Sequence, residues 1–319
     1  MVPVMAVGSR PLVPSRLTPG GVVHGSKRAA TTVIGSYIAL TKPRIIELLL
    51  ITTVPTMVLA QRGWPSTSLV LVTLLGGALA AGGANATNMY VDRDIDALME
   101  RTRHRPLVTG AIKPRNALVF AAALEVAAFF VLWFGANLLA ASLAFGAAAF
   151  YVGVYTLWLK RTSTQNIVIG GAAGAVPVLV GWAAVQNSLS WTPVVLFAAM
   201  FLWTPPHFWA LAVKYADDYR NADVPMLPAV APFAQAVRQM LWYTIALVIS
   251  TLVLIPVADL GWIYSVTAVV LGAMFIGGTI YLGKRPSPAV SMRLFTFSIT
   301  YVTVLFGAMT LDVLVRYGW

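Results

Sequence analysis

Long apolar segments separated by short polar ones repeat along this chain from residue 45 onward. Each segment has about the 20 residues that a helix needs to cross the hydrocarbon core of a bilayer. The nine segments run over residues 45-62, 68-90, 116-135, 138-159, 167-186, 192-213, 236-257, 261-283 and 294-315. Because the connections are short, the pattern predicts an all-α polytopic membrane protein with nine transmembrane helices in one bundle.

The basic residues support this division, because lysine and arginine collect on the cytoplasmic side of membrane proteins. Apart from Arg62 and Arg316, they all lie in alternate connections, at residues 1-44, 92-115, 160-165, 214-238 and 284-293. The distribution predicts a multi-pass cell membrane protein with its amino terminus in the cytoplasm and its carboxyl terminus outside.

Composition agrees with a membrane protein. The chain is 59% hydrophobic and 10% charged, with a mean hydropathy of +0.79, whereas soluble domains are about 45–50% apolar and about 25% charged. The net charge of +11 is explained by topology and by contact with anionic lipid in the bilayer, so it does not indicate nucleic acid binding. Since there are no cysteines, thiolate metal sites are excluded and histidine, carboxylate and carbonyl groups remain as ligands.

Residues 1-33 contain no acidic residue and no long apolar run, which predicts a disordered cytoplasmic tail. The membrane domain is expected to cover 34-319. An acid-poor, arginine-containing leader is also typical of a mitochondrial transit peptide, so the mitochondrial inner membrane is the alternative location.

Asn88, Asp92 and Asp96 stand four apart at the end of the second apolar segment. Residues at this spacing share one helical face, so they predict a ladder of oxygen ligands about 12 Å long. Mg²⁺ takes few carboxylates and completes its shell with water and phosphate. The ladder therefore predicts a magnesium-bound phosphorylated ligand, although a helix leaving the membrane also commonly ends in solvated charge. Asp94 is expected to face solvent or an arginine.

Basic and acidic residues near this ladder extend the candidate site. Arg101 and Arg105 suit phosphate oxygens because guanidinium binds them well, and a second acidic group follows the sixth apolar segment at Asp217, Asp218 and Asp223. Lys42 and Arg44 are expected either to anchor the interface or to reach the site. Lys160 and Arg161 have the same two interpretations.

Three further features remain open at this level. Tyr151, Tyr155 and Trp158 predict either an interfacial belt or an aromatic lining for a carbocation. His207 follows Pro205 and Pro206, and it is either a structural histidine or a ligand. Glu125 and Asp312 lie inside apolar segments, where acids are commonly functional, without an obvious neighbour.

The ladder followed by Arg101-Thr-Arg-His-Arg-Pro-Leu107 resembles the first aspartate-rich motif of the UbiA superfamily of intramembrane prenyltransferases. Within that superfamily, the chain is similar to the protohaem IX farnesyltransferases (haem O synthases). This similarity is carried by Lys42-Pro-Arg-Ile-Ile-Glu47, Asp92-Arg-Asp-Ile-Asp96, Thr204-Pro-Pro-His-Phe-Trp-Ala-Leu211 and Pro225-Met-Leu-Pro228.

The resemblance implies a central cavity open to the cytoplasm, and transfer of farnesyl from farnesyl diphosphate to a vinyl group of haem B with addition of water, giving haem O. It implies Mg²⁺ on Asn88, Asp92, Asp96 and Asp218, diphosphate contacts from Arg101, Arg105, Lys160 and Lys214, and haem contact from His207. Farnesyl diphosphate, haem B and the lipid bilayer are the expected partners, with haem A synthase or oxidase assembly factors as further candidates.

One departure affects the metal site. Aligning the superfamily's second motif through Asp218 puts Lys214 where an aspartate commonly stands, which leaves a second metal in doubt. Two rival functions remain: a prenyltransferase for a quinone or chlorin precursor, and a secondary transporter, whose acids would lie at the midplane instead of at one face.

Overall fold

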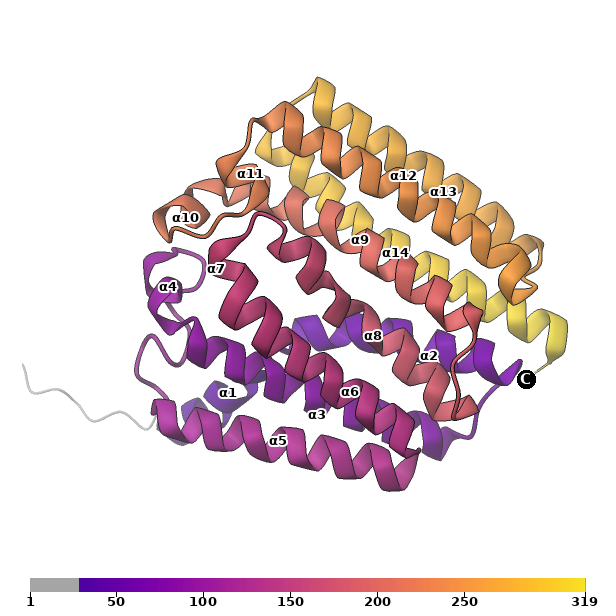
Figure 1. The fold of residues 1–319 in the computed structure, drawn as a ribbon, viewed down its shortest axis with the longest axis horizontal. Coiled ribbons are helices and arrows are strands. Elements are labelled where there is room, and N and C mark those ends of the chain that lie inside the picture. The colour runs from indigo at the N-terminus through magenta and orange to yellow at the C-terminus, as the bar shows by residue number, and fades with distance from the viewer. Residues whose placement is uncertain (1–28, 319) are drawn as a thin grey trace, which may run out of the picture.

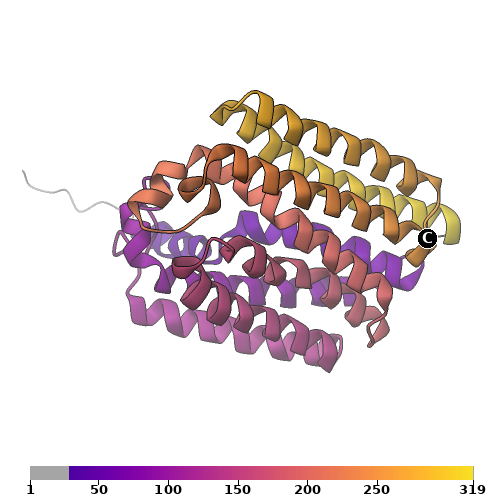
Figure 2. The ribbon, with the colours of Figure 1, turned by 45° about the horizontal axis from the view of Figure 1, so that its top comes forward.

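The computed structural model describes residues 29–318, and this part of the chain is helical with no strand. Its long helices pack side by side into one bundle (Figures 1 and 2). The helices, in chain order, are α1 (Ala29–Thr41), α2 (Pro43–Gln61), α3 (Thr67–Val91), α4 (Arg93–Leu98), α5 (Pro114–Gly135), α6 (Leu138–Phe150), the π-helix η1 (Tyr151–Leu159), α7 (Lys160–Thr162), α8 (Asn166–Gln186), α9 (Trp191–Lys214), α10 (Ala216–Asn221), α11 (Leu227–Val230), α12 (Phe233–Ala258), α13 (Trp262–Lys284) and α14 (Pro288–Tyr317).

Eight helices are long and apolar enough to cross a membrane, counting Leu138–Thr162 as one, and α2 adds a shorter apolar stretch over Ile51–Gln61. This confirms the polytopic all-α prediction, while the count of nine stays a prediction. The predicted tail of 1-33 overlaps α1, which begins at Ala29; the rest of that tail lies outside the described residues.

Helix starts follow from local chemistry. The side chains of Ser66, Asn137 and Ser287 accept hydrogen bonds from the first-turn N–H groups of α3, α6 and α14, which satisfies donors that have no partner within the helix. Proline occupies the first turn of α2, α5 and α14, where its missing N–H costs least.

Small residues bring the helices that carry the site close together. A Cβ added to Gly83 of α3 would lie 2.7 Å from Glu125 Oε1 of α5, and one added to Gly171 of α8 would lie 2.7 Å from the Thr204 side chain of α9. The helix α9 runs unbroken through Pro205 and Pro206.

The short helices α4, α7, α10 and α11 gather at one end of the bundle (Figures 1 and 2), and the carboxyl terminus lies at the other. At that other end Arg62 donates to the Tyr317 hydroxyl at 3.3 Å, and the Tyr317 hydroxyl donates to Asp259 at 2.9 Å. The ladder and the acidic group that includes Asp217 and Asp218 lie by α4 and α10, and so at the same end of the bundle, as predicted from the basic connections.

Candidate active site

The Asn88, Asp92 and Asp96 side chains form the buried centre of the site, being 2%, 0% and 1% exposed. The helix is interrupted, because α3 ends at Val91 and Asp92 is the junction with α4. The predicted spacing still holds, since Asp92 N–H donates to Asn88 O at 2.9 Å and Asp96 N–H donates to Asp92 O at 2.8 Å. The three side chains consequently face one site from two helices.

Within the ladder, Asn88 Nδ2 donates to Asp92 Oδ2 at 2.7 Å, and Lys42 Nζ donates to Asn88 Oδ1 at 2.7 Å. Lys42 reaches Asn88 from the junction of α1 and α2, where its backbone is left-handed with φ 54°. Of the two interpretations of Lys42, the structure supports the one that places it in the site. Arg44 is exposed.

Each ladder carboxylate has a cationic partner. Lys160 forms an ion pair with Asp92, and Arg105 Nη1 lies 2.6 Å from Asp96 Oδ2. Burial of the Lys42 ammonium, with the nearby charges of Arg105 and Lys160, lowers the pKa of Lys42 to about 7. Cations therefore crowd this site, and a bound anion would be stabilised by them.

Asp94 lies outside this centre. Its two carboxylate oxygens each accept from Arg161 at 2.7 Å, and its side chain is 61% exposed. The guanidinium of Arg161 lowers the pKa of Asp94 to about 2. The prediction that Asp94 faces solvent or an arginine is confirmed.

The π-helix η1 brings in a residue that helical spacing did not reveal. Thr156 Oγ1 accepts from Asn88 Nδ2 at 3.0 Å and donates to the carbonyl of Tyr151, five residues back, at 2.9 Å. With the wider turn of a π-helix, Tyr151, Thr156 and Lys160 share the face toward α3. The sequence singled out Tyr151, Tyr155 and Lys160 in this segment but gave no signal for Thr156.

The π-helix also separates the two interpretations of Tyr151, Tyr155 and Trp158, because these residues do not share one environment. Tyr151 and Tyr155 stack with their ring centroids 5.3 Å apart, and the charges of Asp92 and Asp96 act on the Tyr151 hydroxyl. Trp158 is 62% exposed. The two tyrosines thus lie beside the ladder, whereas Trp158 has the exposure of a belt residue.

The second acidic cluster approaches the ladder through the segment that follows α4. Arg101 N–H donates to Asp218 Oδ2 at 3.3 Å, and Arg101 Nη2 donates to the Tyr219 hydroxyl at 3.3 Å. Lys214 is exposed, with its Nζ 5.3 Å from the centre of the Tyr215 ring. Asp217 pairs with Arg220 at the surface.

A divalent metal fits part of this arrangement. Asp92 Oδ1 is buried and accepts no hydrogen bond, although an Arg161 nitrogen lies 3.8 Å away, so a hard oxygen ligand remains free for a cation. Across residues 29–318, however, no three His, Cys, Asp or Glu side chains surround a common point. Asp218 therefore does not join Asp92 and Asp96 in one cluster in this arrangement.

His207 lies in an aromatic stack between α9 and α14. Its ring is 4.1 Å from Trp203 and 4.5 Å from Phe295, measured between centroids, and its Nδ1 is 2.6 Å from Ser298 Oγ. These contacts pack the two helices together. The structure shows no contact between His207 and the ladder among the described residues.

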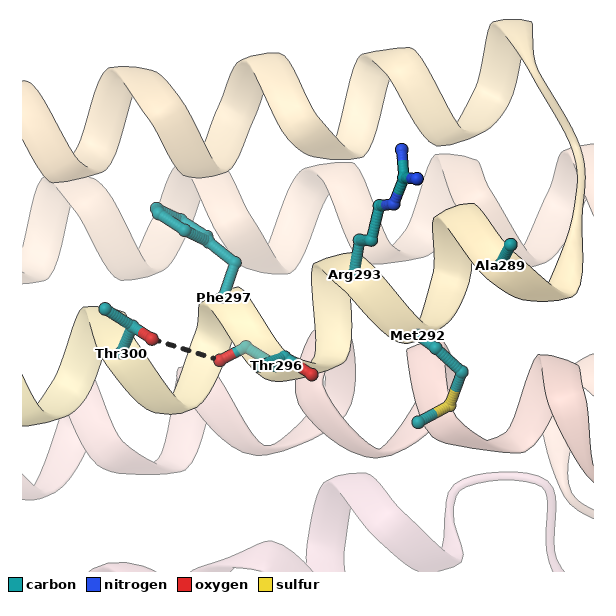
Figure 3. A pocket seen from close by; sticks show the side chains of 6 residues that line it. All are labelled: Ala289, Met292, Arg293, Thr296, Phe297 and Thr300. Atoms are coloured by element: carbon teal, nitrogen blue, oxygen red, sulfur yellow. Dashed lines mark hydrogen bonds between the residues drawn. The ribbon is translucent and has the colours of Figure 1, made fainter.

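A shallow groove of about 450 Å³ lies on α14, lined by Ala289, Met292, Arg293, Thr296, Phe297 and Thr300. Figure 3 shows these side chains along one face of the helix. None of them belongs to the ladder, so this groove is separate from the site. The central cavity open to the cytoplasm therefore stays a prediction.

Long apolar helices that converge on buried carboxylates paired with cations define a polytopic membrane protein with a buried charged site at one end. The chain belongs to the UbiA prenyltransferase family, whose model matches residues 49–303. It is 53% identical over 282 residues to the protoheme IX farnesyltransferase of Paenarthrobacter aurescens, covering 87% of this chain and 88% of that one. It is 49% identical over 308 residues to the Streptomyces coelicolor protein of the same name, covering 93% and 98%.

Solved structures share the fold at lower identity. A digeranylgeranylglyceryl phosphate synthase matches with a TM-score of 0.73 at 17% identity, covering 88% of this chain and 98% of that chain. A UbiA homologue from Archaeoglobus fulgidus, solved with GPP and Mg²⁺, matches with a TM-score of 0.61 at 18% identity, covering 86% and 99%. At these identities the likeness shows the fold alone.

Proposed function

We propose that this protein transfers the farnesyl group of farnesyl diphosphate to a vinyl group of haem B, with addition of water, giving haem O and diphosphate. The observation that carries the proposal is the buried ladder of Asn88, Asp92 and Asp96, ringed by cations, in a chain about half identical to proteins named protoheme IX farnesyltransferase.

Magnesium would be held by Asn88, Asp92 and Asp96, with Asp218 approaching from the second cluster. Asp92 Oδ1, which accepts no hydrogen bond, supports this choice, as does the Mg²⁺ bound by the Archaeoglobus fulgidus homologue. When bound, the metal neutralises diphosphate charge and so makes diphosphate a better leaving group.

The basic side chains stabilise charge on the departing diphosphate. Lys160 and Arg105 pair with Asp92 and Asp96, while Arg101 donates its backbone N–H to Asp218 and its guanidinium to the Tyr219 hydroxyl. Lys214, at the end of α9, is the outermost of the four proposed contacts. Binding of an anion would draw these cations away from their carboxylate partners.

Tyr151 and Tyr155 would face the allylic cation that forms as diphosphate leaves. Their π faces attract a cation, and their rings exclude the water that would hydrolyse it prematurely. We assign His207 to contact with haem B. Because Nδ1 is engaged by Ser298, the other ring nitrogen is the one offered to iron or to a propionate.

The test uses membranes expressing the protein, supplied with haem B, farnesyl diphosphate and Mg²⁺, with extracted haems analysed by mass. The expected product is heavier than haem B by farnesyl plus water, and it is lost with EDTA and in Asp92→Ala. Asp94→Asn is the matched control, because Asp94 is an exposed neighbour paired only with Arg161.

Three outcomes separate the possibilities. A farnesylated haem in wild-type and Asp94→Asn membranes supports the proposal. No product from haem B, together with prenylation of a hydroxybenzoate or a chlorin precursor, would redirect it to another acceptor within the family. Product formation that survives EDTA and Asp92→Ala would remove the metal ladder from the mechanism.

A further inference from the structure

The amino-terminal end of α8 is buried and has no cap. Asn166, Ile167 and Val168 are 0%, 4% and 7% exposed, and the preceding residue, Gln165, makes no capping bond with its side chain. Asn166 N–H donates to Ser163 O at 3.2 Å, but the N–H groups of Ile167 and Val168 find no acceptor within residues 29–318. A buried helix start normally has such partners.

The Asn166 side chain is the second anomaly at this place. Neither Nδ2 nor Oδ1 forms a hydrogen bond, although the residue is fully buried. A buried polar group without a partner is destabilising, and here two unpaired amide atoms occur in the same helical turn as two unpaired N–H groups. An arrangement of this kind is expected where a ligand supplies the missing partners.

The location connects this helix end to the proposed active site. Asn166 follows closely after Lys160 and Arg161, which pair with Asp92 and Asp94. One turn further along the same face, a Cβ added to Gly170 would lie 2.3 Å from the Tyr155 ring. Figure 1 shows α7 and the start of α8 at the end of the bundle that carries α4 and α10.

The charge and the donors specify the ligand. Free N–H groups at the start of a 21-residue helix attract negative charge through the helix dipole, and Asn166 Nδ2 adds two further donors. These groups are donors that suit an oxyanion, and Lys160 and Arg161 precede them in the chain, each paired with a carboxylate.

We propose that Asn166 and the uncapped start of α8 bind an oxyanion of a substrate, and that Asn166 is a positioning residue for that substrate. The proposal rests on the proposed function, which supplies two sources of the oxyanion: the diphosphate of the prenyl donor and a propionate carboxylate of haem. Both present the same acceptor oxygens, so the experiment must distinguish them.

The first measurement is hydrogen–deuterium exchange on the purified wild-type protein, following peptides that cover residues 163–170. Protection by inorganic pyrophosphate with Mg²⁺ assigns the site to the prenyl donor. Protection by haem B but not by its dimethyl ester assigns it to a propionate. No protection by either overturns the proposal, and the binding readout is independent of whether the protein forms any prenylated product.

The second measurement compares Asn166→Ala and Asn166→Asp with Gln165→Ala as the neighbouring control. We expect Asn166→Ala to raise KM for one substrate roughly ten- to hundred-fold, the factor that corresponds to losing a hydrogen bond to a charged group. Asn166→Asp should be worse because it places a carboxylate against the anion. Unchanged KM for both substrates in folded Asn166→Ala protein would refute the role.

Discussion

Asp312 is an intramembrane acid whose role the structure explains as a helix cap. Its carboxylate is 1% exposed and accepts from three backbone N–H groups at the start of α13: Gly261 at 2.6 Å, Ile263 at 3.1 Å and Tyr264 at 3.3 Å. A Cβ added to Gly261 would lie 2.8 Å from Asp312 Oδ1, so the contact requires glycine there. We therefore expect Asp312 to determine stability and not catalysis.

The size of the effect follows from these three bonds. Hydrogen bonds to charged groups contribute about 1.5–3 kcal/mol each, and a lost partner leaves a buried donor unsatisfied. Because two of the three contacts are long, Asp312→Ala should cost about 3–5 kcal/mol, which is at the upper end for a single substitution. Asp312→Asn should cost about half as much, since one oxygen remains while its NH₂ group faces an N–H donor.

The assay is thermal unfolding of the purified protein in detergent, followed by tryptophan fluorescence. Wild type, Asp312→Asn and Asp312→Ala should unfold at successively lower temperatures, with a total shift on the order of 5 to 10 °C. Asp259→Asn is the matched control at the same end of the bundle; its exposed carboxylate pairs with Arg316 and Tyr317, so little change is expected.

Two results would refute this interpretation of Asp312, one from thermal unfolding and one from prenyl transfer measured per folded molecule. If Asp312→Ala unfolds at the wild-type temperature, the cap does not carry the stability assigned to it. If the variant is as stable as wild type and yet loses activity tenfold or more, Asp312 acts in the reaction and the interpretation as a cap is wrong.

Three further outcomes test the site. Thr156→Val, which removes the hydroxyl that accepts from the ladder amide, should lower kcat/KM by roughly fivefold for about 1 kcal/mol of lost hydrogen bonding, measured in the haem assay. Gly170→Ala should impair turnover by displacing the tyrosine ring 2.3 Å from its new Cβ, whereas Gly174→Ala, with nothing within 4 Å, should not. Arg161 lowers the pKa of Asp94 from 3.8 to about 2. Their pair therefore stabilises the fold above about pH 4, and this contribution is lost as the pH falls toward 2. Asp94→Asn should abolish this pH dependence in unfolding scans, while changing the free energy of unfolding by under about 1 kcal/mol at neutral pH.

The sequence by itself determined the class of protein and the position of the ladder. Apolar segments of membrane-spanning length are local features of the chain, and the end of the bundle that carries the charged clusters follows from alternate basic connections. The four-residue spacing of Asn88, Asp92 and Asp96 also placed them together correctly, because their backbone hydrogen bonds preserve it across the break between α3 and α4.

The partners of the ladder were decided by tertiary structure. Lys42 reaches Asn88 from 46 positions away, and Thr156 from 68 positions away; no local pattern encodes contacts at such separations. The π-helix changes which residues share a face, so a period of 3.6 does not identify Thr156. Asp312 shows the converse case: as an intramembrane acid it could have been functional, but packing against the start of α13 makes it a cap.

The unsatisfied groups at the start of α8 also depend on packing. Asn166 is an ordinary residue for a helix start in the sequence, and only its complete burial without a partner makes it a candidate for substrate binding. Sequence periodicity reports which residues face the same way along one helix, whereas the free energy of a buried polar group depends on what the other helices place beside it. For this reason the sequence predicted the class of protein, whereas only the tertiary structure determined which residues make up its site.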